Sequence, residues 1–364
     1  MSDPFELVRA EEMLRGYSAR WFDEKLTVLA VEAEFDADIL NPETGAASRT
    51  YRLGGKIDVL VKDAAERVLI VEHKTSSEDV SMGSFYWKRL RLNAQLPTYL
   101  VGARALGHDP QEILFDVLGK PGQRPSSTVP VRDEFDMKIV FDAKGERVKV
   151  ANGKKWRETG DTAAGYVLQV RDETPDEYRA RVQETICKDP DKFFVRGTVV
   201  RLESEEREAA FDVWMTVANI RESKRLNRHP RNVDSCFKYG APCPMFEVCT
   251  GEASIDDPTR YRRVANPHEE LAASKVGLPL VTNSEMGTYR SCARLHHYRY
   301  ELGVRTVEDG EAQRFGSLIH YGLQGWWEGK RDGLAEGDCL GRAFDMMREP
   351  PQRNATAARS QVTL

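Results

Sequence analysis

Two acidic residues and a lysine lie on neighbouring predicted strands, where they can share one site. Residues 68–74 read as a strand, and the two-residue period of its side chains places Glu72 and Lys74 on one face. The preceding strand carries Asp58, and antiparallel pairing through a short turn would bring its carboxylate near Glu72. Carboxylate oxygens are the ligands that Mg²⁺ and Mn²⁺ prefer. We expect Asp58, Glu72 and the backbone carbonyl of His73 to bind such an ion, with Lys74 assisting phosphodiester hydrolysis.

The alternative for Glu72 and Lys74 is a surface ion pair on an edge strand, which is the usual meaning of a glutamate two residues before a lysine. The four residues that precede Glu72 are Val, Leu, Ile and Val. A buried strand that suddenly carries Glu, His and Lys usually does so to build a site. The setting therefore favours a site over a surface pair.

Hydrophobic periodicity and turn residues predict an α/β chain. Three strands precede a helical stretch, and a further strand follows it. A hairpin insertion, two more helices and another strand come next. The expected helices are 1–25, 83–107, 174–186 (capped by Thr174) and 204–227 (capped by Ser204), and the expected strands are 26–39, 51–61, 67–74, 112–118, 138–142, 146–150 and 194–202.

Composition limits the function classes. The 364 residues are 40% hydrophobic and 30% charged, and they contain no apolar run near the roughly 18 residues that a membrane helix needs. The chain also starts without a signal peptide, so we expect a cytoplasmic protein without a membrane partner. A net charge of −5 argues against a surface that is basic everywhere, although local Lys and Arg clusters can still neutralise phosphates. Three of the six cysteines fall within fourteen residues, which favours a metal or cluster site over disulfides.

Asp58, the Glu72-His73-Lys74 strand and the Gln95 to Tyr99 helix resemble, in order and spacing, the motifs of the RecB-type PD-(D/E)XK nucleases. The resemblance implies a restriction-endonuclease-like α/β core, in which a mixed central sheet is flanked by helices. It also implies that Gln95 and Tyr99, one helical turn apart, hold the DNA or support the site.

The cysteines extend the resemblance. Cys236, Cys243 and Cys249 resemble the C-terminal triplet of the iron–sulfur nucleases, which include CRISPR-adaptation nucleases and AddB-type helicase–nucleases. In that group a [4Fe-4S] cluster takes a fourth cysteine, and a G-x-x-x-H motif adds a histidine to the metal site. Here the resemblance assigns these roles to Cys292 and to His320, which follows Gly316.

In these relatives the fourth cysteine and the histidine come first in the chain, whereas here they come last. A circular permutation, a body followed by the truncated start of a second copy, and a sequence assembled out of order would each explain this. We favour permutation, because residues 275–364 supply the missing parts and no duplicates. The expected divisions are 1–125 (nuclease core), 126–230 (insertion and helical region), 231–252 (cysteine cluster), 253–274 (linker), 275–346 (segment resembling the family N-terminus) and 347–364 (flexible tail).

Other candidates have plainer interpretations. His296 and His297, beside Cys292, could indicate zinc, but the family pattern there expects a polar helix rather than ligands. Cys187 and Cys339 lack motif context, so we interpret them as buried small hydrophobic residues.

The prediction is a metal-dependent deoxyribonuclease, an exonuclease in end processing, recombination or repair in a phage or bacterium. Its expected cofactors are Mg²⁺ or Mn²⁺ and a [4Fe-4S] cluster. Its expected partners are DNA and a recombination or helicase protein. One alternative is a non-catalytic DNA-binding or recombination partner that keeps the nuclease fold, and another is a zinc-stapled structural module.

Overall fold

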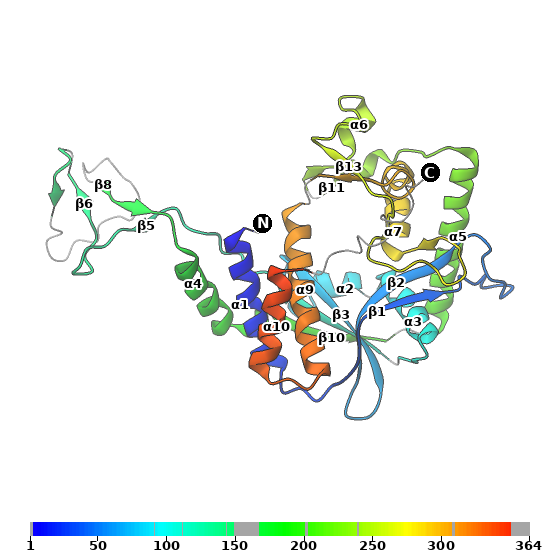
Figure 1. Ribbon diagram of the computed structural model, residues 1–364, viewed down its shortest axis with the longest axis horizontal. Helices are drawn as coiled ribbons and strands as arrows, with labels where there is room; N and C mark the ends of the chain where they lie inside the picture. Colours follow the sequence, from blue (N-terminus) through cyan, green and yellow to red (C-terminus); the bar gives the residue numbers. More distant parts are fainter. Residues whose placement is uncertain are drawn as a thin grey trace, which may run out of the picture.

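The computed structural model describes residues 3–90, 92–110, 112–142, 144–148, 167–200, 203–238, 240–307 and 310–350. A mixed sheet lies at its centre, in the strand order β1-β2-β3-β4-β10, with β14 paired to β2 (Figure 1). Only the β3–β4 and β14–β2 pairs in this sheet are parallel. The strands are β1 (Thr27–Ala37), β2 (Arg52–Lys62), β3 (Val68–Ser76), β4 (Glu112–Gly119), β10 (Phe194–Val199) and β14 (Leu280–Val281).

Helices cover both faces of this sheet, as a restriction-endonuclease-like fold requires. Successive strand residues point to opposite faces, so Val59 and Val61 enter one hydrophobic core while Leu60 enters the other. The first core is covered by α1 (Pro4–Trp21), α4 (Pro175–Lys188), α9 (Glu311–Arg331) and α10 (Glu336–Arg348). The second is covered by α2 (Phe85–Leu90), α3 (Gln95–Ala105) and α5 (Glu203–Leu226).

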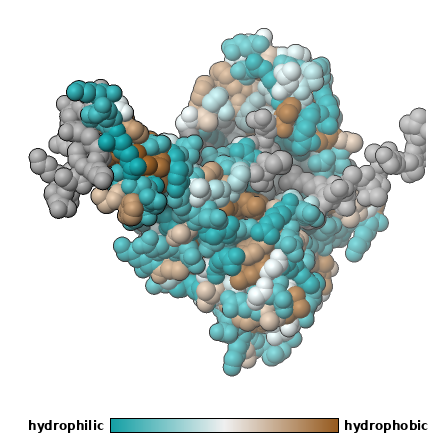
Figure 2. Space-filling view, turned by 60° about the vertical axis from the view of Figure 1, so that its left-hand side comes forward, coloured by the Kyte–Doolittle hydropathy of each residue, from teal (hydrophilic) through white to brown (hydrophobic). Residues whose placement is uncertain are grey.

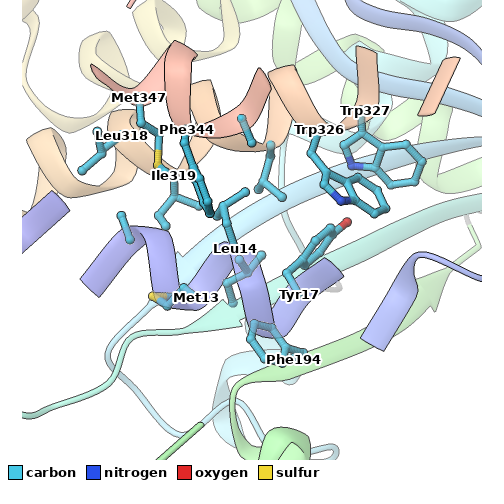
Figure 3. Close-up of a cluster of buried hydrophobic side chains, with 14 of the residues drawn as sticks. Met13, Leu14, Tyr17, Phe194, Leu318, Ile319, Trp326, Trp327, Phe344 and Met347 are labelled. Carbon is cyan, nitrogen blue, oxygen red and sulfur yellow. The ribbon is translucent and has the colours of Figure 1, made fainter. Parts of the chain in front are cut away.

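The first core joins the two ends of the described chain. Figure 3 shows Tyr17 of α1 beside Trp326 and Trp327 of α9, with Phe344 of α10 in the same cluster. Trp326 and Trp327 are fully buried, so this pair packs the core rather than stacking on bases. The C-terminal helices are therefore part of the sheet domain.

A small β extension stands off from the body between β4 and α4 (Figures 1 and 2). It contains the predicted hairpin, since β6 pairs antiparallel with β7, but the described strands are shorter than expected. Its strands are β5 (Val129–Pro130), β6 (Val140–Phe141), β7 (Arg147–Val148), β8 (Val167–Leu168) and β9 (Val170–Arg171).

The cysteine region has its own small core around Met245, Tyr261 and Val304. The segment 253–274, expected as a linker, contains β13, which pairs antiparallel with β15. It is therefore a folded connection. The elements of this region are η3 (Val233–Ser235), β11 (Phe237–Lys238), β12 (Ala241–Pro242), α6 (Phe246–Thr250), β13 (Tyr261–Arg263), α7 (Asn283–Ser291), α8 (Ala293–His296), the π-helix η4 (His297–Glu301) and β15 (Val304–Thr306).

Several expected boundaries shift. Strand β1, Thr27–Ala37, is slightly shorter than the expected strand 26–39, and the helical stretch 83–107 divides into α2 and α3. Thr174 caps α4, as predicted, and it also forms a capping box with Glu177, which was not predicted. Helix α5 begins at Glu203, so Ser204 lies inside the helix instead of capping it. Helix α10 extends to Arg348, beyond the expected start of the tail, and residues 351–364 lie outside the described residues.

Another short helix, η2, covers Pro190–Lys192 before β10. Among the helices in the described ranges, none combines the length and the hydropathy needed to cross a membrane.

Candidate active site

The predicted site lies where β2 separates from β3. Strand β2 pairs with β3 from Val59 to Lys62 and with β14 at Arg52 and Leu53, so Asp58 sits at the fork between these two partners. At this fork the Asp58 carboxylate accepts a hydrogen bond from the His73 backbone N–H at 2.9 Å. The Asp58 side chain thus lies where the pairing between β2 and β3 ends and the two strands separate.

Glu72 and Lys74 follow from the same strand geometry. Their side chains project towards α3, where the Lys74 Nζ ion-pairs with Glu72 and donates a hydrogen bond to Gln95 Oε1 at 2.9 Å. Gln95 in turn donates from Nε2 to the Tyr99 hydroxyl at 2.6 Å. The lysine is therefore held in one position by residues from both a strand and a helix.

His320 comes from α9, on the opposite side of the sheet. Its Nδ1 lies 3.8 Å from Asp58 Oδ2. Asp58, Glu72, Lys74, Gln95, Tyr99 and His320 are therefore brought together, although they span more than 260 residues of chain.

His73 points away from this face, into the first core. Trp327 donates from Nε1 to His73 Nε2 at 2.9 Å, which leaves Nδ1 as the protonated nitrogen, 3.4 Å from Asp58 Oδ2. The His73 imidazole therefore helps to orient the Asp58 carboxylate. The part of His73 that can still bind a metal ion is its backbone carbonyl.

The two carboxylates differ in charge. Burial raises the pKa of Glu72 to about 7, and the neighbouring Asp58 charge adds to the rise, while Lys74 opposes it. Burial also disfavours the ionised form of Asp58, but His320, His73 and Lys74 together hold its pKa well below the usual range. Such opposed shifts within one pair of acids are typical of functional sites.

The donor set fits a hard divalent ion. Glu72 is 1% exposed, and its Oε2 has no hydrogen-bond partner among the described residues. A buried carboxylate oxygen without a partner costs free energy unless a cation satisfies it. Burial in the site also lowers the pKa of His320, which keeps the imidazole neutral and able to bind a metal.

Sequence reasoning missed Glu32. This residue lies in β1 between Val31, paired with Val59, and Ala33, paired with Ile57, so it faces Asp58 across the ladder. Its φ of 51° is left-handed, a conformation that non-glycine residues adopt at a cost and that is common near active sites. Burial and then the Asp58 charge raise the pKa of Glu32 to about 7. The sequence signal was an acid at the end of an apolar run, as at Glu72.

The four cysteines assigned to a cluster also gather in one region. Burial raises the pKa of the Cys243 thiol, and the charges of Cys249, Cys292 and Cys236 raise it further, so the four sulfurs lie close enough to interact. Hydrogen bonds tie their segments together, including one from Asn232 to the Ser291 carbonyl at 2.9 Å. The donor set, four thiols on converging segments, suits an iron–sulfur cluster or zinc.

The two remaining cysteines differ from each other. Cys339 is buried, as expected, whereas Cys187 is exposed, so the interpretation of Cys187 as a buried residue was wrong. Cys187 lies near the end of α4, on a surface turn of the helix.

Comparison with known proteins agrees with this geometry. A profile of the PD-(D/E)XK nuclease superfamily matches residues 5–249 and 281–362. No curated protein gives a match. The matched ranges cover most of the chain, including both strands of the fork and α9. The chain belongs to the PD-(D/E)XK nuclease superfamily.

Proposed function

We propose that this protein is a metal-dependent DNA exonuclease acting in end processing, recombination or repair. Two observations carry the proposal. Asp58, Glu72, Lys74 and His320 gather at the fork of the sheet, and the buried Glu72 Oε2 has no hydrogen-bond partner in the part of the chain that the structure describes. Membership in a superfamily of nucleases supports hydrolysis of a nucleic acid.

Each side chain has a role in this proposal. Asp58, Glu72, His320 and the His73 carbonyl would hold Mg²⁺ or Mn²⁺, which supplies positive charge against the phosphate and lowers the pKa of bound water. Lys74, positioned by Gln95 and Glu72, stabilises the charge that develops on the phosphate oxygens. Tyr99 holds the Gln95 amide through its hydroxyl.

Metal binding should weaken as pH falls through about 7, because the raised pKa of Glu72 lets a proton compete for its carboxylate. Below that pH, we expect an affinity loss of up to about 10-fold for each pH unit. Titration of Mn²⁺ into the protein between pH 5.5 and 8.5, followed by calorimetry, measures this. An affinity that stays constant across this range would contradict the proposed Glu72 ligand.

For the rotated order of motifs, we propose a circular permutation that completes one site. Strand β14 adds parallel to β2, and α9 packs against α1, β1 and β3. These contacts place His320 against Asp58 of the same chain. A truncated second copy would not be expected to fill the position that the first copy lacks.

A [4Fe-4S] cluster is the proposed occupant of the four cysteines. A zinc site would draw its sulfurs to about 3.8 Å from one another, as tetrahedral bonds of about 2.3 Å require. Among the described residues, no three of these thiols come within 4.8 Å of one another. The wider spacing supports the larger cluster, which would brace the fold, since hydrolysis transfers no electrons.

Replacing Cys292 by Ser should therefore remove the cluster. We expect the anaerobically purified wild-type protein to be brown and to contain about four iron atoms per chain, and Cys292→Ser to lose most of both. Iron analysis and visible absorbance measure the change. Cys187→Ser, at an exposed cysteine, is the control and should keep its iron. A colourless wild type that contains zinc would contradict the cluster.

A pocket of about 710 Å³ beside His320 is the proposed path for the DNA strand. Arg299 and Arg305 line it, and both guanidinium groups lie against the Tyr300 ring, at 5.8 and 5.4 Å from its centroid. Among the described residues Arg299 forms no ion pair, and its Nε is buried without a hydrogen-bond partner. An arginine in this state is suited to bind a phosphate.

Arg299→Ala should weaken DNA binding in a salt-dependent way. Loss of one phosphate contact reduces the slope of log K against log salt concentration by about 0.7 for a single strand. Fluorescence anisotropy with an oligonucleotide measures this in a Glu72→Gln background that does not cleave. Arg263→Ala is the control, because Arg263 ion-pairs with Asp256 and does not line the pocket. Equal slopes for the two variants would exclude this path.

The exonuclease itself is tested with end-labelled linear DNA and covalently closed circular DNA. With Mg²⁺ or Mn²⁺, we expect linear DNA to be degraded from its ends and circular DNA to persist, and EDTA or Glu72→Gln to stop the reaction. Circular DNA cut as fast as linear DNA would overturn the exonuclease and indicate an endonuclease. Linear DNA that persists at every metal concentration would overturn the proposal of a nuclease.

A further inference from the structure

A second group of possible metal ligands lies between the end of α5 and the π-helix η4. His229 follows α5, while His297 and Glu301 are the first and last residues of η4. One ligand atom from each of the three lies within 4.8 Å of the other two. Single-turn π-helices are frequently found at functional sites.

The distances match a tetrahedral ion. Bonds of about 2.0 to 2.1 Å at tetrahedral angles separate two ligand atoms by about 3.3 Å. Here the His297 Nδ1 lies 2.9 Å and the His229 Nε2 lies 3.7 Å from Glu301 Oε2, so the two values bracket that separation. Two imidazoles and one carboxylate are a common donor set for zinc.

Burial adds an independent observation. His229 is 9% exposed, and its Nδ1 has no hydrogen-bond partner among the described residues. Its Nε2, the nitrogen that faces the proposed ion, lies 3.7 Å from Glu301 Oε2, beyond hydrogen-bonding range of that oxygen. A cation between Nε2 and Glu301 Oε2 would give this nitrogen the partner that Glu301 alone does not provide.

A second layer of imidazole and carboxylate groups lies beside Glu301, although neither Glu301 Oε1 nor His296 Nδ1 forms a hydrogen bond among the described residues. His296 Nδ1 lies 3.4 Å from Glu301 Oε1, and His296 Nε2 lies 2.8 Å from Glu285 Oε1. Glu285 Oε2 lies 2.7 Å from His268 Nε2. Metal-binding carboxylates are usually held in this manner by outer residues.

One feature competes with a shared ion. The His229 and His297 rings stack with their centroids 3.9 Å apart and their planes 19° apart. The lone pairs of parallel rings do not meet at one point, so a common ion requires one ring to turn about its Cβ–Cγ bond. The competing arrangement is a stacked pair that holds no metal, and it predicts no gain from zinc.

We propose that His229, His297 and Glu301 form a binding site for zinc or a similar divalent transition metal, distinct from the nuclease centre and from the four cysteines. Three protein ligands leave the fourth position open to water. The ion would join the segment after α5 to η4, which begins five residues after Cys292.

The test measures the metal content of the full chain. Every protein in the comparison carries Glu72→Gln, which weakens metal binding at the nuclease site. The protein is dialysed against Zn²⁺ and then buffer, and zinc per chain is measured by mass spectrometry. His229→Phe keeps an aromatic ring for stacking and removes both nitrogens. His108→Phe, a histidine outside this group, is the control. We expect His229→Phe to lose about one zinc per chain and His108→Phe to lose none.

Co²⁺ separates this site from the cysteines, because cobalt bound to nitrogen and oxygen lacks the intense absorption of cobalt bound to thiolate. Difference spectra between wild type and His229→Phe should contain only the weak visible bands. Circular dichroism checks that His229→Phe is folded, and Glu301→Gln provides a second loss of the ligand set. Unchanged zinc content in both folded variants, or a wild type whose zinc is entirely bound to thiolates, would overturn the site.

Discussion

Lys74→Ala should lower the rate constant for DNA cleavage by about 10²- to 10³-fold, the usual effect of removing one group that stabilises transition-state charge. The side chain is 28% exposed at the fork, with Nζ fixed between Glu72 and Gln95 Oε1. Its loss also removes the positive charge that opposes the rise in the Glu72 pKa. The variant should therefore require more metal as well as react more slowly.

Single-turnover cleavage with saturating DNA and metal separates these two effects. Lys62→Ala is the matched control, because Lys62 also pairs with a glutamate, Glu66 at 3.0 Å, but at the opposite end of the β2–β3 hairpin. It should cleave at the wild-type rate. Cleavage by Lys74→Ala at the wild-type rate would remove Lys74 from the proposed chemistry.

Arg196→Met should lower the free energy of unfolding by about 3 to 5 kcal/mol, the effect of breaking a buried ion pair. The Arg196 side chain is 7% exposed and donates to Asp116 Oδ2 at 2.8 Å. Asp116 is fully buried on β4 and also accepts from the Tyr17 hydroxyl at 2.6 Å. Removing the arginine leaves this carboxylate charge uncompensated beneath the site.

Urea denaturation measures the change. Arg20→Met is the control, since Arg20 pairs at 2.5 Å with Asp191, whose side chain is 80% exposed, and pairs of this kind contribute at most about 1 kcal/mol. Adding Asp116→Asn to Arg196→Met should recover part of the loss because it removes the isolated charge. Equal stability of the two single variants would show that Arg196 is not needed to compensate Asp116.

The strands and motif residues of the core were predictable because their signals are local. The apolar run before Glu72 and the turn after Lys62 specify a hairpin, and the register that follows brings Asp58 opposite the E-x-K strand. The Thr174 cap could likewise be predicted from the four consecutive residues Thr174 to Glu177. The helices on both faces follow from the alternating burial of the strand residues.

Other features depend on contacts between distant segments, which no local pattern encodes. Glu32 lies at the site because β1 has a left-handed backbone conformation at this residue, opposite Asp58. The partner of His73, Trp327, lies 254 residues away, and β13 forms only because β15 pairs with it. The sequence did not assign His296 and His297 as ligands, and their acidic partners, Glu285 and Glu301, become neighbours only after folding.

The placement of His320 on α9 has a consequence for the timing of synthesis. The ribosome releases Asp58, Glu72 and Lys74 well before residue 320, so an unfinished chain contains both acids and the lysine but lacks the His320 imidazole. In the motif order that the resemblance to RecB-type nucleases implies, the histidine would emerge first. On the proposed chemistry, the nascent protein has no nuclease activity until α9 packs against the sheet. A protease that cuts between β4 and α9 would abolish this activity only if the two parts separate.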